Sequence, residues 1–135
     1  MSTPSKNIKI AIIEDDIAIV QMYRTKFETE GYTVETAGDG ATGLELVSSF
    51  KPDIILLDLM MPNVNGIEFL SSLRKNAGTK HSKVIVLTNM GDSVTATRVN
   101  ELDVQDFIVK ADMTPAEVSA RIDRVLAAPA PSNQQ

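Results

Sequence analysis

The sequence predicts an α/β fold in which five parallel strands form a doubly wound sheet in the order 2-1-3-4-5. Short runs rich in Ile, Val and Leu alternate with longer stretches whose apolar residues recur at helical spacing, and this cycle occurs five times. Strand-then-helix units joined by right-handed crossovers place helices on both faces of one parallel sheet. With so few strands, the expected architecture is an open sheet.

The composition fits a single domain. The chain has 135 residues, of which 43% are hydrophobic and 23% charged, as is ordinary for a globular protein with its own core. This domain is expected to span residues 8–128. Residues 1–7 are polar and residues 129–135 hold two prolines among small polar residues, so both ends are expected to be flexible termini or a linker.

The first half of the chain is predicted to contain two strand–helix pairs. Residues 8–13 and 32–37 suit strands because they are rich in β-branched side chains. Residues 16–30 form the first predicted helix, which Gly31 is placed to end. The apolar positions of this helix are Ile17, Val20, Tyr23 and Phe27, and those of the second helix are Leu44, Val47 and Phe50.

The second half is predicted to supply three more strands. Residues 53–57 are the most continuous apolar run and are expected to form a central strand covered on both faces. Residues 83–87 and 106–109 are shorter runs of the same kind. A helix marked by Ile67, Leu70 and Leu73 and a weaker helix at residues 92–102 separate these strands.

The last helix has the clearest start signal. Thr114 can cap it, Pro115 suits its first position, and Glu117 completes a capping box. Its apolar stripe is Val118, Ile122, Val125 and Leu126.

Composition also excludes several classes of function. The chain has no cysteine, which removes disulfides, thiolate metal sites and cysteine nucleophiles. Its net charge is −5 with no long block of Lys or Arg, so direct contact with nucleic acid is not expected. The apolar runs are too short for a membrane span and the polar start lacks a secretory signal, so we expect a cytoplasmic protein.

Acidic residues follow two of the predicted strands. Glu14, Asp15 and Asp16 come after the first strand, and Asp58 follows the third. These strands are neighbours in the predicted order, and their carboxyl ends lie at the edge where such sheets bind ligands. Glu14, Asp15 and Asp58 should therefore converge, whereas Asp16 precedes a helix and suits an N-cap. Convergent carboxylates repel, so a hard divalent cation is expected among them, and Mg²⁺ is the usual ion where phosphate chemistry follows.

The expected charges of this site balance. Three carboxylates carry three negative charges, and Mg²⁺ with the Lys110 ammonium carries three positive ones, so the site can accept a phosphoryl dianion. Asp58 is the candidate nucleophile because it ends the rigid central strand. Lys110 and the Thr88 hydroxyl follow the last two strands and are placed to contact the phosphoryl oxygens.

At these residues the chain resembles the receiver domain of bacterial two-component response regulators, a flavodoxin-like (CheY-like) fold. The resemblance extends from about Lys9 to Leu126 and consists of four motifs in order, each at a predicted strand end. They are Glu14-Asp15-Asp16, the run from Asp53 to Asp58 with Pro62 and Gly66, Leu87-Thr88, and Phe107 to Lys110.

The resemblance implies a role for each acidic residue. Asp58 resembles the phosphoacceptor, which takes a phosphoryl group from the phosphohistidine of a sensor histidine kinase or phosphotransfer protein. Glu14 and Asp15 resemble the acidic pair that holds Mg²⁺, with Asp58 and the backbone carbonyl of Met60 as further ligands. Such a domain is a signalling phosphoacceptor and not an enzyme, although it assists its own phosphorylation and dephosphorylation.

The resemblance also implies a switch. Thr88 resembles the switch hydroxyl, Lys110 the site lysine, and Phe107 the aromatic residue that turns inward when Thr88 moves toward the phosphoryl group. This population shift changes the surface made by residues 92–102, residues 106–109 and the last helix, which then binds a downstream output protein or domain.

The same surface could join two copies into a homodimer. Asp106 and Arg121 resemble one of the ion pairs that join receivers in this way. The rest of that pattern is incomplete, since Ala96 stands where a charged partner is expected.

The chain departs from the family pattern at three positions. Asn89 follows Thr88 where a small residue is usual, Ala111 replaces the proline after Lys110, and Phe107 stands where Tyr is usual. Without that proline a cis peptide bond is not expected. Met60 and Asn89 are larger than minimal, which leads to the hypothesis that they crowd attacking water and lengthen the life of the phosphorylated state.

Three other readings are weighed against this one. A flavin-binding flavodoxin needs a Ser-, Thr- and Gly-rich loop after the first strand, where Glu14-Asp15-Asp16 would repel phosphate. An aspartyl hydrolase needs its nucleophile there with a second Asp two residues on, which Asp15-Asp16-Ile17 does not supply. A binding module that has kept the fold but lost phosphorylation remains an alternative.

His81, the only histidine, lies in a polar connection and is expected to be exposed.

Overall fold

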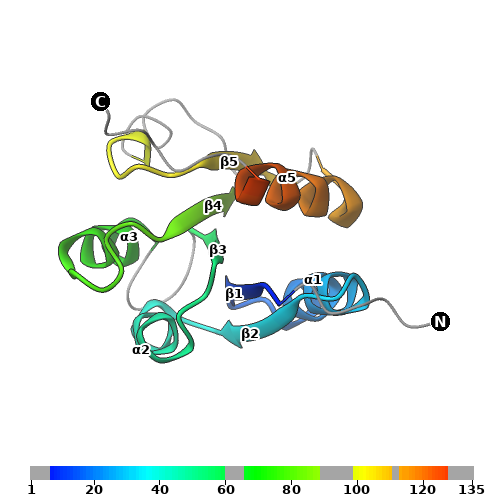
Figure 1. Ribbon diagram of the computed structural model, residues 1–135, viewed down its shortest axis with the longest axis horizontal. Helices are drawn as coiled ribbons and strands as arrows, with labels where there is room; N and C mark the ends of the chain where they lie inside the picture. The colour runs from blue at the N-terminus through cyan, green and yellow to red at the C-terminus, as the bar shows by residue number, and fades with distance from the viewer. Residues whose placement is uncertain (1–6, 60–65, 89–98, 111–112, 128–135) are drawn as a thin grey trace.

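A computed structural model describes residues 7–59, 66–88, 99–110 and 113–127. Its centre is a five-stranded parallel sheet in the order β2-β1-β3-β4-β5, which confirms the predicted fold and strand order (Figure 1). The strands are β1 (Lys9–Ile13), β2 (Thr33–Ala37), β3 (Ile54–Asp58), β4 (Lys83–Thr88) and β5 (Asp106–Val109).

Helices cover both faces of this sheet. Helices α1 and α5 lie on one face, and α2 and α3 on the other (Figure 1). Their bounds are α1 (Ile17–Thr29), α2 (Gly40–Phe50), α3 (Gly66–Lys75) and α5 (Pro115–Ala127). Most of the helix predicted at residues 92–102, the expected flexible end at 129–135 and residues 1–6 lie outside the described residues. No helix in the described ranges combines the length and the apolar character that crossing a membrane requires.

The central strand divides the core into two halves. All five residues of β3 are buried, as the continuous apolar run predicts. Because side chains alternate along a strand, Ile54 and Leu56 pack toward α1 and α5, while Ile55 and Leu57 pack toward α2 and α3. Asp58 therefore stands at the end of the most enclosed element of the described chain.

Ile17 corrects the predicted apolar face of α1. Its side chain is 76% exposed, whereas Tyr23 and Phe27 are buried. At 3.6 residues per turn, Ile17 lies about 120° around the helix from Tyr23, so a repeat of three residues does not keep both on one face. The first residue of α1 thus faces solvent beside the carboxyl end of β1.

The predicted helix ends are confirmed. Asp16 caps α1 by accepting a hydrogen bond from the Ile19 amide at 3.2 Å. Gly31 follows α1 with φ of 98°, a left-handed conformation that glycine adopts without strain. In the capping box of α5, the Glu117 amide donates to Thr114 Oγ1 at 3.2 Å and the Thr114 amide donates to Glu117 Oε1 at 2.8 Å. These local signals hold because they depend on neighbours in the sequence.

Candidate functional site

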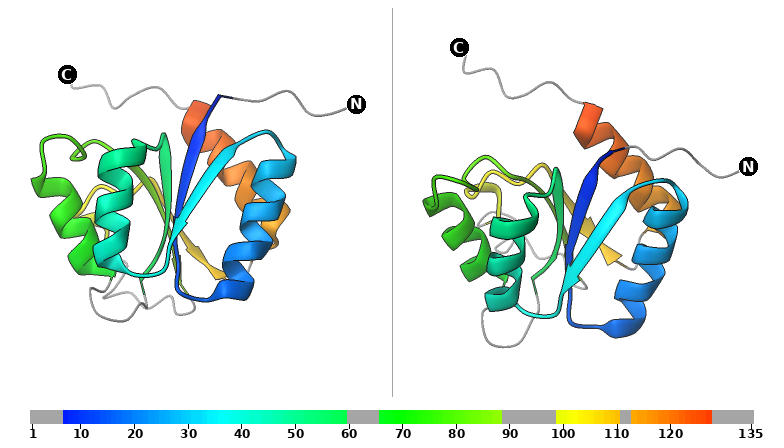
Figure 2. Two further views of the ribbon diagram at one scale, coloured as in Figure 1. Left: turned by 90° about the horizontal axis from the view of Figure 1, so that it is seen from below. Right: turned by 60° about the horizontal axis from the view of Figure 1, so that its bottom comes forward.

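The predicted site residues lie at the carboxyl ends of the strands. Glu14, Asp15 and Asp16 follow β1, Asp58 ends β3, and Thr88 ends β4. Since the strands are parallel, their carboxyl ends lie on the same side of the molecule (Figure 2). The acidic residues thus lie between β1 and β3, where the strand order reverses direction, as expected for this architecture.

Three carboxylates converge there. Glu14, Asp15 and Asp58 each offer an oxygen within 4.8 Å of the others. The side chains of Glu14 and Asp58 are buried, with 4% exposed in each, while Asp15 is exposed. All three donors are carboxylate oxygens, the ligand type that hard cations such as Mg²⁺ and Ca²⁺ prefer. The donor set therefore fits a divalent cation.

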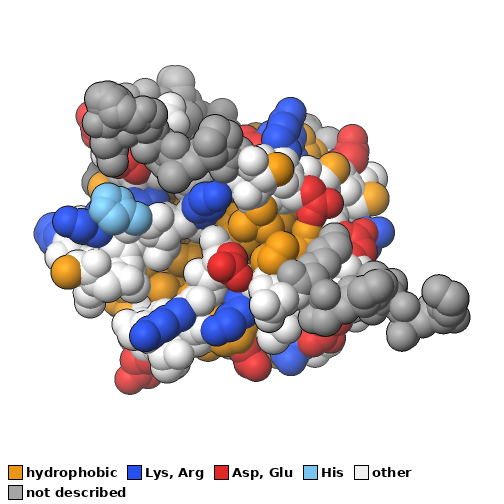
Figure 3. All heavy atoms as spheres, in the orientation of Figure 1, with side chains coloured by type: hydrophobic (Ala, Val, Ile, Leu, Met, Phe, Trp, Pro, Cys, Tyr) orange, Lys and Arg blue, Asp and Glu red, His pale blue; other side chains and the backbone are white. Residues whose placement is uncertain are grey.

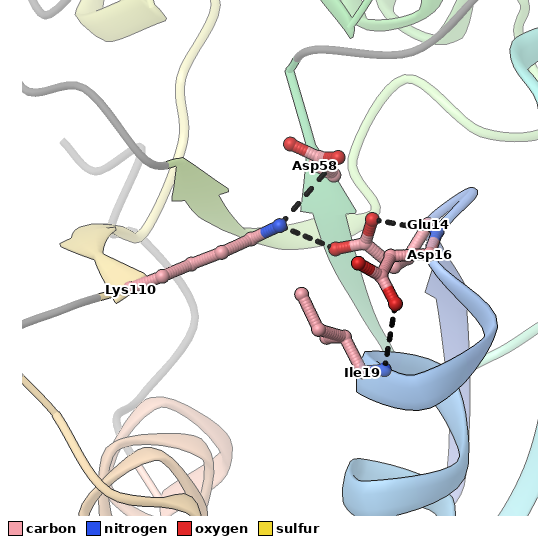
Figure 4. A network of polar contacts seen from close by, with 5 residues as sticks. All are labelled: Glu14, Asp16, Ile19, Asp58 and Lys110. Atoms are coloured by element: carbon pink, nitrogen blue, oxygen red, sulfur yellow. Dashed lines mark hydrogen bonds and ion pairs between the residues drawn. The ribbon is translucent and has the colours of Figure 1, made fainter.

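Lys110 is the cation that the chain itself brings to this cluster (Figure 4). Its Nζ lies 2.6 Å from Glu14 Oε1 and 3.6 Å from Asp58 Oδ2. The sequence predicted Lys110 at this site but did not predict Glu14 as its nearer partner. Among the residues that the structure describes, one ammonium faces three carboxylates, so the group keeps an excess of negative charge.

The pKa of Glu14 is raised by its surroundings. Burial raises the pKa of Glu14 above its ordinary value of 4.5, and neighbouring Asp58 raises it further. The Lys110 ammonium and the Asp16 amide, which donates to Glu14 Oε2 at 3.1 Å, lower the pKa but do not offset burial. Burial at this site thus disfavours the charged carboxylate of Glu14, and a divalent cation would reverse this.

Thr88 and Phe107 lie on one face of the sheet. In the β4–β5 register Val86 faces Phe107 and Thr88 faces Val109, so both Phe107 and Thr88 share the face of Val86. Thr88 is 2% exposed, and Phe107 is half-buried against the apolar cluster that contains Val86. Movement of one of these side chains can therefore change the position of the other.

Gly66 allows the end of β3 to approach the start of α3. Its amide donates to the Leu59 carbonyl at 3.1 Å, and a Cβ at this position would lie 2.5 Å from Leu59 Cα. No side chain fits there. The glycine of the second motif thus has a steric reason next to Asp58.

Asp106 and Arg121 pair within one chain. Arg121 Nη1 lies 2.5 Å from Asp106 Oδ2, and Asp106 Oδ1 accepts a hydrogen bond from the Phe107 amide at 2.8 Å. The two residues were expected from resemblance as a contact between copies. Within the described chain they tie β5 to α5, and the contact between copies stays a prediction.

Some expectations concern residues that the structure does not describe. These residues are Met60, Asn89, Ala96 and Ala111. The Met60 ligand, the crowding hypothesis and the peptide bond after Lys110 therefore stay predictions. His81 is exposed, as predicted.

Tyr23 is a neighbour of the site that sequence reasoning missed. Burial raises the pKa of its phenol, and the charge of Glu14 raises it further. Its helical spacing indicated a core residue, which is correct, since its side chain is 3% exposed. Nothing in the sequence indicated its nearness to Glu14, because that depends on how α1 packs.

Comparisons with known proteins identify the same family. Residues 10–123 match the family model described as the response regulator receiver domain. The chain is 32% identical to the DNA-binding response regulator MtrA of Mycobacterium tuberculosis over 84% of its own length and 48% of that protein. It also resembles the structure of the chemotaxis protein CheY4 of Vibrio cholerae, with 27% identity, a TM-score of 0.82, and coverage of 87% of this chain and 98% of that one.

Another structural neighbour is the phosphorylated cyanobacterial phytochrome response regulator RcpA. It shares 25% identity, with a TM-score of 0.81 over 93% of this chain and 99% of that one. The chain spans about half the length of the curated relatives it matches. The name of MtrA includes DNA binding, so these relatives do not support the expectation that nucleic acid is not a direct partner.

Proposed function

This chain belongs to the response regulator receiver domain family, the phosphoacceptor domains of two-component signalling, and from that premise we propose that Asp58 is its phosphoacceptor. The observation that carries the proposal is the setting of this carboxylate. Asp58 ends the enclosed strand β3, is 4% exposed, and has the carboxylates of Glu14 and Asp15 and the Lys110 ammonium beside it. A nucleophile held in this way is positioned for in-line transfer.

Mg²⁺ is the proposed cofactor, held by Glu14, Asp15 and Asp58, with the Met60 carbonyl as a further expected ligand. When bound, this ion supplies positive charge that offsets the carboxylates and the incoming phosphoryl group. The carboxylate oxygens within 4.8 Å of one another support this assignment, because they repel without a cation.

Lys110 has two proposed partners in turn. Its Nζ is bonded to Glu14 at 2.6 Å and is farther from Asp58, at 3.6 Å. Once other positive charge offsets Glu14, the ammonium is released to bind a phosphoryl oxygen on Asp58. Lys110 therefore reduces the repulsion among the carboxylates before the reaction. Afterwards it stabilises the phosphorylated product.

The proposed transfer is a direct displacement at phosphorus. A carboxylate oxygen of Asp58 forms the new oxygen–phosphorus bond, while the nitrogen–phosphorus bond of the donor's phosphohistidine breaks and its electron pair stays on the imidazole nitrogen. The donor is a sensor histidine kinase or a phosphotransfer protein. The chain assists its own phosphorylation by holding Asp58 and Lys110 in place, and it assists hydrolysis by the same groups.

The output is a population shift between two surfaces. Thr88 donates its hydroxyl to the phosphoryl group, and Phe107, on the same face of the sheet, changes position with it. The surface around β5 and α5 then binds an output protein or domain, or a second copy of this chain. Because the net charge is −5, we propose proteins as its direct partners. We also propose a cytoplasmic location, with which the absence of cysteine is consistent.

Beryllofluoride with Mg²⁺, a mimic of the phosphoryl group, tests this function. Amide resonances of Thr88 and Phe107 should shift in the wild-type protein and stay unchanged in Asp58→Asn. Asp53→Asn, one strand length away and not a proposed ligand, is the matched control and should respond as wild type. A folded wild-type protein that shows no response at millimolar Mg²⁺ would identify a module that has lost phosphorylation.

A further inference from the structure

Arg74, in the last turn of α3, binds four main-chain carbonyl oxygens. Its Nε donates to the Leu102 carbonyl at 2.7 Å and its Nη2 to the Asp103 carbonyl at 2.9 Å. Its Nη1 donates to the Ser82 carbonyl at 2.8 Å and the Lys80 carbonyl at 3.1 Å. These contacts join the turn after α3 to the turn before β5. We refer to this set of four hydrogen bonds as the Arg74 clasp.

The clasp places a charged group among main-chain acceptors. Burial lowers the pKa of Arg74, and the nearby charge of Asp103 opposes that shift. A guanidinium has five N–H donors in one plane, so it can reach carbonyls in two separate turns at once. A lysine ammonium concentrates its donors on a single atom and cannot span them.

The strand that follows the clasp is short and lies at the edge of the sheet. β5 has four residues and pairs only with β4, at the edge of the sheet. The turn before it includes Asp103, whose φ of 58° is a left-handed conformation that non-glycine residues seldom adopt. Gln105 then adds two bonds to Val84, one through its amide and one through its side chain, at 2.8 and 2.6 Å. The clasp and Gln105 therefore hold the start of β5, while buried Ile108 and the Asp106–Arg121 pair hold the strand itself.

Two proposed site residues depend on this strand. Phe107 lies within β5, and Lys110 follows directly after it. Helix α3 starts beyond the carboxyl end of β3 and runs back along the sheet (Figure 2), so its last turn, which holds Arg74, lies at the opposite end of the sheet from Glu14 and Asp58. The clasp borders two strands that lead to the site: β5 through Leu102 and Asp103, and β4 through Ser82.

We propose that Arg74 is a positioning residue for phosphorylation: by holding the turn at Leu102 and Asp103, it sets the register of β5 and thereby delivers Lys110 and Phe107 to the site. This inference rests on the proposed function, because it assumes that Lys110 and Phe107 act there. It adds a residue that touches neither the acidic cluster nor the phosphoryl group.

The test compares four variants with the wild-type chain. Arg74→Met removes the clasp, and Arg74→Lys keeps the charge but cannot span both turns. Lys75→Met removes an exposed charge from the same helical turn. Val34→Ala weakens the core at β2, the other edge strand, where Val34 is 3% exposed. Two quantities are measured: amide hydrogen exchange of residues 104–109 without ligand, and the affinity for beryllofluoride with Mg²⁺ followed at the Phe107 amide.

Arg74→Met and Arg74→Lys should raise exchange in β5 more than in β2 and should weaken beryllofluoride binding about fivefold, a typical coupling between distant sites. Lys75→Met and Val34→Ala should bind it as the wild type does. If Arg74→Met does not fold, Arg74→Lys carries the test, since it keeps the charge and most of the side chain.

Two results would overturn the inference. The first is wild-type beryllofluoride affinity in both Arg74 variants. The second is an equal loss in Val34→Ala, which would make the effect one of global stability. Failure of the wild-type chain to respond to beryllofluoride would instead overturn the proposed function itself.

Discussion

At the amino end of the sheet, Lys9, Arg74 and Lys83 each donate to main-chain carbonyl oxygens, whereas at the carboxyl end three carboxylates face the single ammonium of Lys110. Lys9 Nζ bonds the Phe50 carbonyl at the end of α2 at 3.0 Å, and Lys83 Nζ bonds the Val125 carbonyl in the last turn of α5 at 3.3 Å. Figure 3, which views this end, shows Lys and Arg side chains at several separate places. Charge is satisfied locally at one end and left in excess at the other.

The opposite directions of the strands and helices explain this difference. In a parallel α/β sheet the helices run opposite to the strands, so helix C-termini, with their unpaired carbonyls, gather at the amino end. Cations there have acceptors from the chain itself. At the carboxyl end helix N-termini supply amide donors, as the Asp16 amide does to Glu14, but three carboxylates converge there. A charged residue thus indicates a ligand site only where the chain does not already satisfy it.

The largest expected effect is at the carboxyl end. Asp58→Asn should reduce phosphorylation to background, a loss of at least about a thousandfold, because the amide is not a nucleophile. The metal-free unfolding free energy should not fall, because one of three converging negative charges is removed. Phosphotransfer from a small-molecule phosphodonor and urea unfolding measure the two quantities. A clear loss of stability would contradict the view that this cluster carries excess charge.

The amino end should respond in the opposite sense. Arg74→Met should lower the unfolding free energy by about 2 kcal/mol, because hydrogen bonds from a charged donor are lost and carbonyls are left unsatisfied. Phosphorylation of Asp58 should remain measurable. Urea unfolding checks the change, with Lys75→Met as control. Equal stability of these two variants would show that the clasp contributes nothing to the fold.

A smaller effect is the pH dependence of the unfolding free energy, to which Glu14 at the carboxyl end contributes. The folded pKa of Glu14 is raised above 4.5, so between pH 4.5 and that pKa the folded state holds a proton that the unfolded state has released. The unfolding free energy of the metal-free protein should therefore increase as pH falls toward 4.5. Glu14→Gln, or added Mg²⁺, should remove this rise. Unfolding by urea at several pH values measures it, and an identical profile in Glu14→Gln would refute it.

The same profile should turn over at lower pH. Hydrogen bonds from Thr42 lower the pKa of Asp39, the N-cap of α2, and hydrogen bonds from Thr114 lower the pKa of Glu117. Their contributions are present above the ordinary pKa values and are lost as pH falls through the lowered ones. Glu117→Gln should therefore alter only the acidic side of the profile.

The smallest expected effect is at a single helix end. Lys83→Met should lower the unfolding free energy by about 0.5 kcal/mol, since one cation near a helix C-terminus contributes little. The loss should diminish in high salt, where such charges are screened. A loss as large as that of Arg74→Met would mean that the number of carbonyls held does not set the contribution.

Local and periodic features were predictable from the sequence. The strand order follows from five apolar runs alternating with amphipathic stretches, and the caps at Asp16 and Thr114 follow from neighbours three residues away. The convergence of Glu14, Asp15 and Asp58 also follows, because the carboxyl ends of neighbouring parallel strands must meet.

Tertiary packing decided what these rules leave open. The exposed Ile17, the bond of Lys110 to Glu14, the internal pair of Asp106 with Arg121 and the contact of Arg74 with Leu102 were not predicted. Glu14 and Lys110 are 96 positions apart in the sequence, and Arg74 and Leu102 are 28 apart. Periodicity specifies which side of an element is buried and where it ends, but the partner of a long charged side chain depends on angles and distances between elements that no local pattern encodes.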